Sequence, residues 1–157
     1  PPSPILAHLL ESDRWTSRER HDRRRGLFAR DACRSALALL HVVGRVEDIE
    51  RAAVASVGPR IEHHPRFPQR VNVGFMQVLD VQRIRLRVWE RGVGETLACG
   101  SGACAVGVAA VLSGRAERDV RIQLRGGVLR IRWPESDGPV YMTGPAAHVF
   151  DGELEWP

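Results

Sequence analysis

Apolar and polar residues alternate most regularly in the second half of the chain, and this alternation predicts a series of strands. Ile84, Leu86 and Val88 alternate with two arginines and a tryptophan, which is typical of a half-buried strand. Gly126-Gly127 predicts a two-residue hairpin turn between two further strands. The same pattern predicts strands at residues 71–80, 120–124, 128–133, 140–143 and 148–150.

Two segments have the apolar content or spacing of helices. Residues 103–112 form the longest apolar run and predict a buried helix between the second and third strands. A second helix is expected to begin at the acidic residues 47–48 and to end at Gly58-Pro59. The combination predicts an α+β fold, with a mostly antiparallel sheet around a buried central helix.

The composition is that of an ordinary globular protein, with 43% hydrophobic and 27% charged residues among 157. All 23 basic residues are arginine. A pyridoxal-phosphate enzyme needs a lysine for its Schiff base, and a P-loop needs a lysine on the phosphates. Neither chemistry can be built from this sequence.

Charge divides the chain into two parts. The net charge is +4, and residues 1–30 contribute +3 of it. Residues 1–45 are therefore expected to form a basic N-terminal segment, and residues 46–157 to form one domain. The arginine-rich arm raises the alternative of nucleic-acid binding. Because the rest of the chain is nearly neutral and lacks a basic patch, we expect no nucleic-acid partner.

The N-terminus and the cysteines bear on where the protein works. A membrane-spanning helix needs about 20 apolar residues, twice the ten of residues 103–112, so no membrane contact is expected. Pro1-Pro2-Ser3-Pro4 has no basic region of a secretory signal, and the missing initiator Met indicates a processed chain or a fragment. Three cysteines favour a reducing compartment over a disulfide framework, so a cytoplasmic location is expected.

Residues 90–104 carry the candidate chemistry. Four glycines lie within eleven residues and end where the buried helix begins, so backbone N–H groups at Gly100 and Ser101 are expected to form an anion site. Cys99 precedes that helix, a position at which the pKa of a thiol falls. A thiolate beside a bound carboxylate suits removal of a proton from the α-carbon. The alternatives are an ordinary glycine-rich turn and a buried structural cysteine, which is our interpretation of Cys104.

The segment that begins Glu90-Arg91-Gly92 and continues through residues 98–105, Ala-Cys-Gly-Ser-Gly-Ala-Cys-Ala, resembles the second catalytic signature of the diaminopimelate epimerase family. Residues 71–78, 144–146 and 149–153 also resemble family segments in order and spacing. The resemblance implies a cofactor-independent isomerase of lysine and peptidoglycan synthesis that interconverts L,L- and meso-2,6-diaminopimelate. It also implies two lobes, each of which supplies one cysteine to the cleft between them.

The resemblance assigns roles to seven residues. It implies that Cys99 is the catalytic cysteine of this lobe, and that Gly100 and Ser101 bind the α-carboxylate of the substrate through their N–H groups. Asn72 would bind the distal end of the substrate. Glu90 would contact an ammonium group and polarise the site, and Arg91 would hold a carboxylate. His41 matches a family histidine that lies just before this lobe.

The rest of the family pattern is missing. The Asn-Gly-x-Arg-Cys signature of the N-terminal lobe has no counterpart, Cys33 does not match it, and Leu39 replaces a substrate-binding Asn. We therefore expect an incomplete chain with one of the two cysteine sites, completed by a homodimer or by a complementary N-terminal lobe. A non-catalytic lobe that binds amino acids or a partner protein is the alternative. His63-His64 predicts a surface turn, so no metal site is expected.

Overall fold

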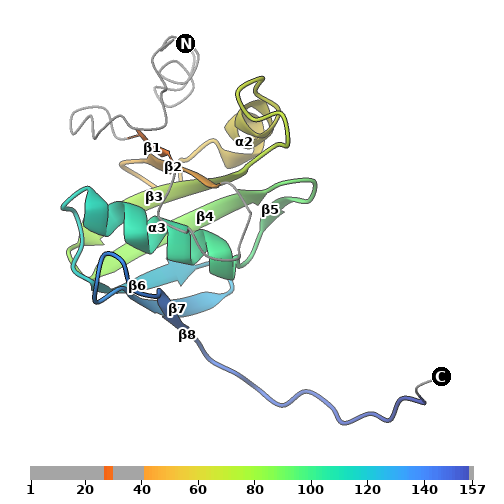
Figure 1. The fold of residues 1–157 in the computed structure, drawn as a ribbon. Coiled ribbons are helices and arrows are strands. Elements are labelled where there is room, and N and C mark those ends of the chain that lie inside the picture. Colours follow the sequence, from red (N-terminus) through yellow and green to blue (C-terminus); the bar gives the residue numbers. More distant parts are fainter. Residues whose placement is uncertain (1–26, 30–40, 156–157) are drawn as a thin grey trace.

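The computed structural model describes residues 27–29 and 41–155 of the chain (Figure 1). The expectations for the arginine-rich arm and for Cys33 lie outside these residues. The strands are β1 (Leu27–Ala29), β2 (His41–Arg45), β3 (Asn72–Asp80), β4 (Arg83–Glu90), β5 (Gly94–Thr96), β6 (Asp119–Leu124), β7 (Gly127–Arg132) and β8 (Tyr141–Thr143), and the helices are α2 (Val54–Glu62) and α3 (Gly100–Leu112).

These strands form a single mixed sheet. The strand order is β1-β2-β3-β4-β6-β7-β8, and the short strand β5 pairs with β4 without being part of this order. The β2–β3 and β4–β6 pairs are parallel, and the other pairs are antiparallel. The α+β class expected from the sequence is confirmed with this mixed sheet. The finer expectation of a mostly antiparallel sheet around a central helix stays a prediction.

The sheet extends to the N-terminal side of residue 46. β2 ends at Arg45 and pairs along its length with β3. The division of the chain into residues 1–45 and 46–157 stays a prediction.

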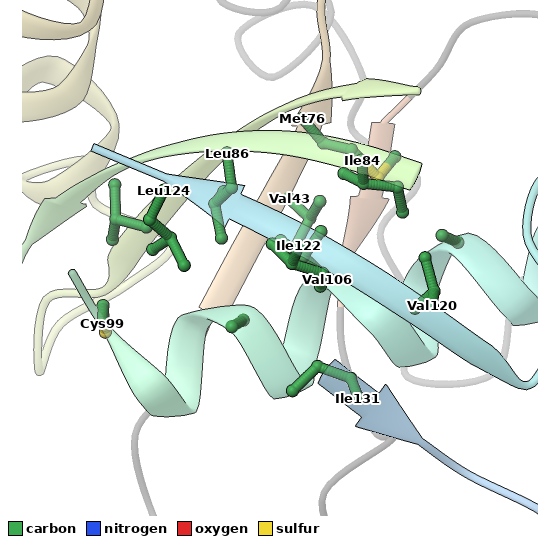
Figure 2. Close-up of a cluster of buried hydrophobic side chains, with 13 residues drawn as sticks. Val43, Met76, Ile84, Leu86, Cys99, Val106, Val120, Ile122, Leu124 and Ile131 are labelled. Atoms are coloured by element: carbon green, nitrogen blue, oxygen red, sulfur yellow. The ribbon is translucent and has the colours of Figure 1, made fainter. Parts of the chain in front are cut away.

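Helix α3 packs against one face of the sheet. Ala103, Val106 and Ala110 on the helix join a buried cluster with residues of β3, β4, β6 and β7 (Figure 2). The approach is closest at Gly107, where an added Cβ would lie 2.8 Å from Cγ2 of Ile131 on β7. A glycine at this position lets the helix backbone come within contact distance of the strand.

Helix α2 packs against the opposite face of the sheet. Val57 and Ile61 of α2 contact a second buried cluster that includes Val73 and Phe75 of β3. The prediction of a helix from residue 47 to residue 58 was wrong at both ends, because α2 begins at Val54 and includes Pro59. Burial of residues on both sides of Pro59 outweighs the backbone hydrogen bond that a proline cannot donate.

The chain after β8 runs away from the sheet (Figure 1). Residues 144–155 form neither helix nor strand, so the predicted strand at residues 148–150 was wrong. Val149, Phe150 and Leu154 of this segment are exposed, Phe150 to 79%. Apolar alternation without a pairing partner does not make a strand.

In the part of the chain that the structure describes, neither helix combines the length and the apolar content needed to cross a bilayer.

Candidate active site

The topology brings four of the candidate residues to one end of the sheet. β3 begins at Asn72, and the antiparallel β4 ends at Glu90, so the start of one strand lies beside the end of the other. β2 runs parallel to β3 and pairs His41 with Asn72. The start of α3 lies at the same end, because a Cβ added at Gly102 in its first turn would lie 3.4 Å from Cγ2 of Val88, near the end of β4. Residues that are far apart in the sequence thus form one constellation.

Cys99 is the N-cap residue of α3. Its backbone is extended, and its Sγ accepts a hydrogen bond from the Gly102 N–H at 3.4 Å. The Ser101 hydroxyl lies 3.5 Å from the same sulfur. Cys99 is 6% exposed and lies at one end of the buried cluster between α3 and the sheet (Figure 2). The thiol therefore has an apolar environment on one side and two hydrogen-bonding groups on the other.

The environment of Cys99 raises the pKa of its thiol. Burial is the main cause, and the Glu90 carboxylate adds to it, while the hydrogen bonds from Ser101 and Gly102 act in the opposite direction. The expectation of a lowered pKa at the helix N-terminus was therefore wrong, because desolvation outweighs the hydrogen bonds from Ser101 and Gly102. In this environment burial favours the thiol form of Cys99 over the thiolate.

Glu90 acts on three neighbours at the end of β4. Its Oε1 accepts a hydrogen bond from the Thr96 hydroxyl at 2.6 Å across the β4–β5 pair. Its charge opposes ionisation of Cys99 and favours protonation of His41. Burial nevertheless lowers the pKa of His41, and its Nε2 is buried without a hydrogen-bond partner. A neutral imidazole and a carboxylate therefore lie beside the thiol end of the site.

The side chain of Asn72 binds the backbone of Arg91. The Asn72 Oδ1 accepts a hydrogen bond from the Arg91 N–H at 2.7 Å, and Asn72 is 3% exposed. The Arg91 guanidinium donates through Nη1 to the Gln69 carbonyl at 2.9 Å. Asn72 thus holds the Glu90-Arg91 turn in place, a contact that the sequence did not suggest.

The first turn of α3 is closely covered. A Cβ added at Gly100 would lie 3.1 Å from the sulfur of Met142 on β8, and one at Gly102 would lie 3.2 Å from the Cys99 Sγ. Glycine at these two positions therefore avoids the crowding that a side chain would cause against Met142 and Cys99. N–H groups at the start of a helix favour an anion through the helix dipole.

Sequence reasoning missed three contributors to this region, namely Thr96, Met142 and Glu62. Thr96 and Met142 lie on short strands whose pairing brings them to the site. Glu62 lies next to a predicted surface turn but is 2% exposed. The informative signal at Glu62 was the apolar pattern of α2, which places that residue on the buried side.

The adjacent histidines point to separate neighbours. His63 lies 2.8 Å through Nδ1 from the Pro59 carbonyl, and the His64 Nδ1 accepts from the Arg66 N–H at 3.3 Å. Within residues 27–29 and 41–155, no three His, Cys, Asp or Glu side chains are grouped as metal ligands would be.

The fold and the sequence place this chain among known proteins. A Bacillus anthracis phenazine biosynthesis protein of the PhzF family superposes with a TM-score of 0.51 at 21% identity, over 74% of this chain and 38% of that chain, which shows a shared fold. Residues 36–149 match the family model of diaminopimelate epimerase. The chain belongs to the diaminopimelate epimerase family.

Two curated relatives show the extent of the match. The chain is 60% identical over 114 residues to the diaminopimelate epimerase of Stutzerimonas stutzeri and 55% identical over 129 residues to that of Azotobacter vinelandii. The matches cover 73% and 79% of this chain but 41% and 47% of those proteins. The chain thus spans less than half the length of the curated relatives it matches.

Proposed function

We propose that this chain supplies one half of a diaminopimelate epimerase site, in which Cys99 transfers a proton at the α-carbon of 2,6-diaminopimelate. The observation that carries the proposal is the thiol at the N-cap of α3, beside Glu90 and the first-turn amides. Because burial favours the thiol form of Cys99, it acts as the proton donor in one direction. A base on the opposite face of the α-carbon takes the substrate proton as the Cys99 S–H bond breaks and the new C–H bond forms.

Polar groups of both signs suit a substrate that carries two ammonium and two carboxylate groups. Gly100 and Ser101 bind the reacting carboxylate at the start of α3. Glu90 contacts an ammonium group, Arg91 a carboxylate and Asn72 the distal end of the substrate. Burying such a substrate without these partners would be unfavourable, and no cofactor is needed for the proton transfers.

In the reverse direction, Cys99 must act as a base. The hydrogen bonds to its sulfur from Ser101 and Gly102 then stabilise the thiolate. We assign His41 to the same site, as a buried histidine near Glu90. A complementary lobe or a second copy of the chain supplies the opposite base, and the enzyme works in the cytoplasm.

Substrate binding is the first test. We expect titration of the ¹⁵N-labelled chain with meso-diaminopimelate to give saturable shifts of the Gly100 and Ser101 amide resonances. Cadaverine, which lacks both carboxylates, should bind at least about tenfold more weakly, a difference of ~1.4 kcal/mol. The Arg91→Gln variant should show the same loss, whereas Arg51→Gln, at an exposed position, should not.

The absence of saturable shifts at the start of α3 would overturn the proposal. A binding lobe without catalysis is the second candidate, favoured by the burial and raised pKa of Cys99. Binding of diaminopimelate that is unaffected by Cys99→Ser, with no α-proton exchange after addition of the missing lobe from a relative, would establish that alternative.

A further inference from the structure

We infer that Glu62 is a positioning residue, whose buried carboxylate clamps the Glu90-Arg91 turn at the geometry that the site requires. Glu62 is the last residue of α2, and its carboxylate accepts hydrogen bonds from Trp89 and Gly92, which flank the Glu90-Arg91 pair. The inference rests on the proposed function, because it concerns how that site is held together.

The two carboxylate oxygens bind on either side of the turn. Oε2 of Glu62 accepts a hydrogen bond from the Trp89 Nε1–H at 2.7 Å, and Oε1 accepts one from the Gly92 N–H at 2.9 Å. Trp89 directly precedes Glu90, and Gly92 directly follows Arg91. The carboxylate therefore bridges the two residues that flank the Glu90-Arg91 pair.

The carboxylate is charged although it is 2% exposed. Burial raises the pKa of Glu62, but the hydrogen bonds from Trp89 and Gly92, together with His63 and Arg70, lower it below the ordinary value. The guanidinium of Arg70 lies 3.5 Å from Oε1. A buried carboxylate with these partners is rigid, because losing any of them would leave a charge unsatisfied.

Neighbouring residues fix how the Trp89 indole and the Glu62 carboxylate are oriented toward each other. A Cβ added at Gly58, one helical turn before Glu62, would lie 2.5 Å from Cγ of Trp89. The indole thus packs directly on the α2 backbone, and its N–H reaches the residue one turn later on the same face. Arg70 has a φ of 59°, a conformation unfavourable for a residue other than glycine, and its contact with Glu62 helps to offset that strain.

The clamp and Asn72 hold the turn from two sides. Asn72 accepts from the Arg91 N–H and Glu62 accepts from the Gly92 N–H, so two successive amides are fixed by buried side chains. Glu90 precedes these two amides and acts on the Cys99 thiol. If the clamp is lost, the carboxylate of Glu90 moves relative to Cys99, and the guanidinium of Arg91 moves relative to the substrate.

The Glu62→Gln variant tests this inference, because a glutamine amide accepts through one atom where the carboxylate accepts through two. We expect the apparent pKa of Cys99 to fall toward the value that Cys99 has in the Glu90→Gln variant. The ¹³Cβ chemical shift of Cys99 during a pH titration measures it. We also expect the dissociation constant of meso-diaminopimelate to rise about tenfold, and hydrogen exchange of the Gly92 amide to accelerate. Glu47→Gln, which changes an exposed carboxylate, is the matched control.

Trp89→Phe provides a second variant if Glu62→Gln does not fold. It removes one donor to the carboxylate and keeps an aromatic ring against Gly58, so the same changes should appear at smaller size. A lowered melting temperature with an unchanged Cys99 titration and unchanged diaminopimelate affinity would overturn the inference, because a purely stabilising role predicts that result. The Cys99 titration needs no substrate, so it decides the inference even if the wild-type chain fails to bind diaminopimelate.

Discussion

At the scale of single residues, the state of Cys99 depends on the balance between burial and hydrogen bonding. Desolvation and Glu90 favour the thiol, whereas Ser101 and Gly102 favour the thiolate, and the first pair prevails. The unfolded chain ionises this thiol near the ordinary value of 9.0, before the folded chain does. The contribution of Cys99 to the free energy of unfolding is therefore fully present below that pH and declines as pH rises through the higher folded pKa.

The Glu90→Gln substitution should lower the pKa of Cys99, because a carboxylate next to a thiolate raises the free energy of the ionised form. We expect faster alkylation of Cys99 between neutral pH and pH 9, measured by peptide mass spectrometry so that each cysteine is followed separately. Glu47→Gln should leave the rate unchanged. A Cys99 pKa that rises or does not move in Glu90→Gln would contradict the assignment of Glu90 as its electrostatic neighbour.

Sequence reasoning located Cys99 correctly at the start of a helix but misjudged its ionisation. The start of a helix depends on local backbone preferences. The glycine-cysteine pattern therefore suffices to predict that a helix begins after residue 99. The burial comes from strands β4 and β6, which pack against α3 but lie elsewhere in the sequence. Glu62 was missed because its role also depends on distant residues. Its hydrogen-bond partners lie 27 and 30 positions away in the sequence.

At the scale of elements, alternation predicted β6 and β7 well, because one face of each strand packs toward α3. It also located β4 and β3, although residues of β3 pack against helices on both faces of the sheet. The predictions failed where tertiary contacts determine whether a helix ends or a strand forms. Pro59 was expected to end a helix but lies inside α2, and residues 148–150 alternate without finding a strand to pair with. Parallel pairing of β2 with β3 and of β4 with β6 also cannot be deduced from alternation, which is the same for both directions.

Close packing of α3 on β7 leads to a prediction about Gly107. In Gly107→Ala, the new Cβ would meet Ile131 at 2.8 Å, and overpacking of this kind is unfavourable by about 1–3 kcal/mol. Higher helix propensity would recover ~1 kcal/mol, so we expect the free energy of unfolding in urea to fall by up to about 2 kcal/mol.

Ala105→Gly, at a partly exposed position of the same helix, serves as the control and should lose ~1 kcal/mol through helix propensity alone. A gain in stability for Gly107→Ala would show that propensity prevails and that α3 is not held tightly against Ile131.

At the scale of the whole molecule, the proposed function makes the described residues one side of a proton-transfer site. Cys99 lies at the start of α3, whereas Cys104 lies within the helix and packs partly buried against the same cluster. Inversion at a carbon needs an acid and a base on opposite faces. The matches cover less than half the length of the curated relatives, which fits the proposal that the site is divided between two lobes.

We expect the chain alone to give little or no inversion of meso- or L,L-diaminopimelate in D₂O. General acid–base groups each contribute about 10²–10⁴-fold to the rate, so the loss of one partner should make deuterium incorporation at the α-carbon very slow. ¹H NMR and chiral chromatography would measure incorporation and inversion, and Cys99→Ser gives the background. Rapid incorporation with inversion would refute a half site.

The gathering of His41, Asn72, Glu90 and Cys99 at one sheet end also sets the order in which the site can form during synthesis. His41 leaves the ribosome first and Cys99 last, so the thiol emerges onto strands that have already been made. Contacts between such distant positions form slowly, because closing the intervening loops is entropically unfavourable. The growing chain therefore has no assembled site until α3 has been translated and has docked on the sheet.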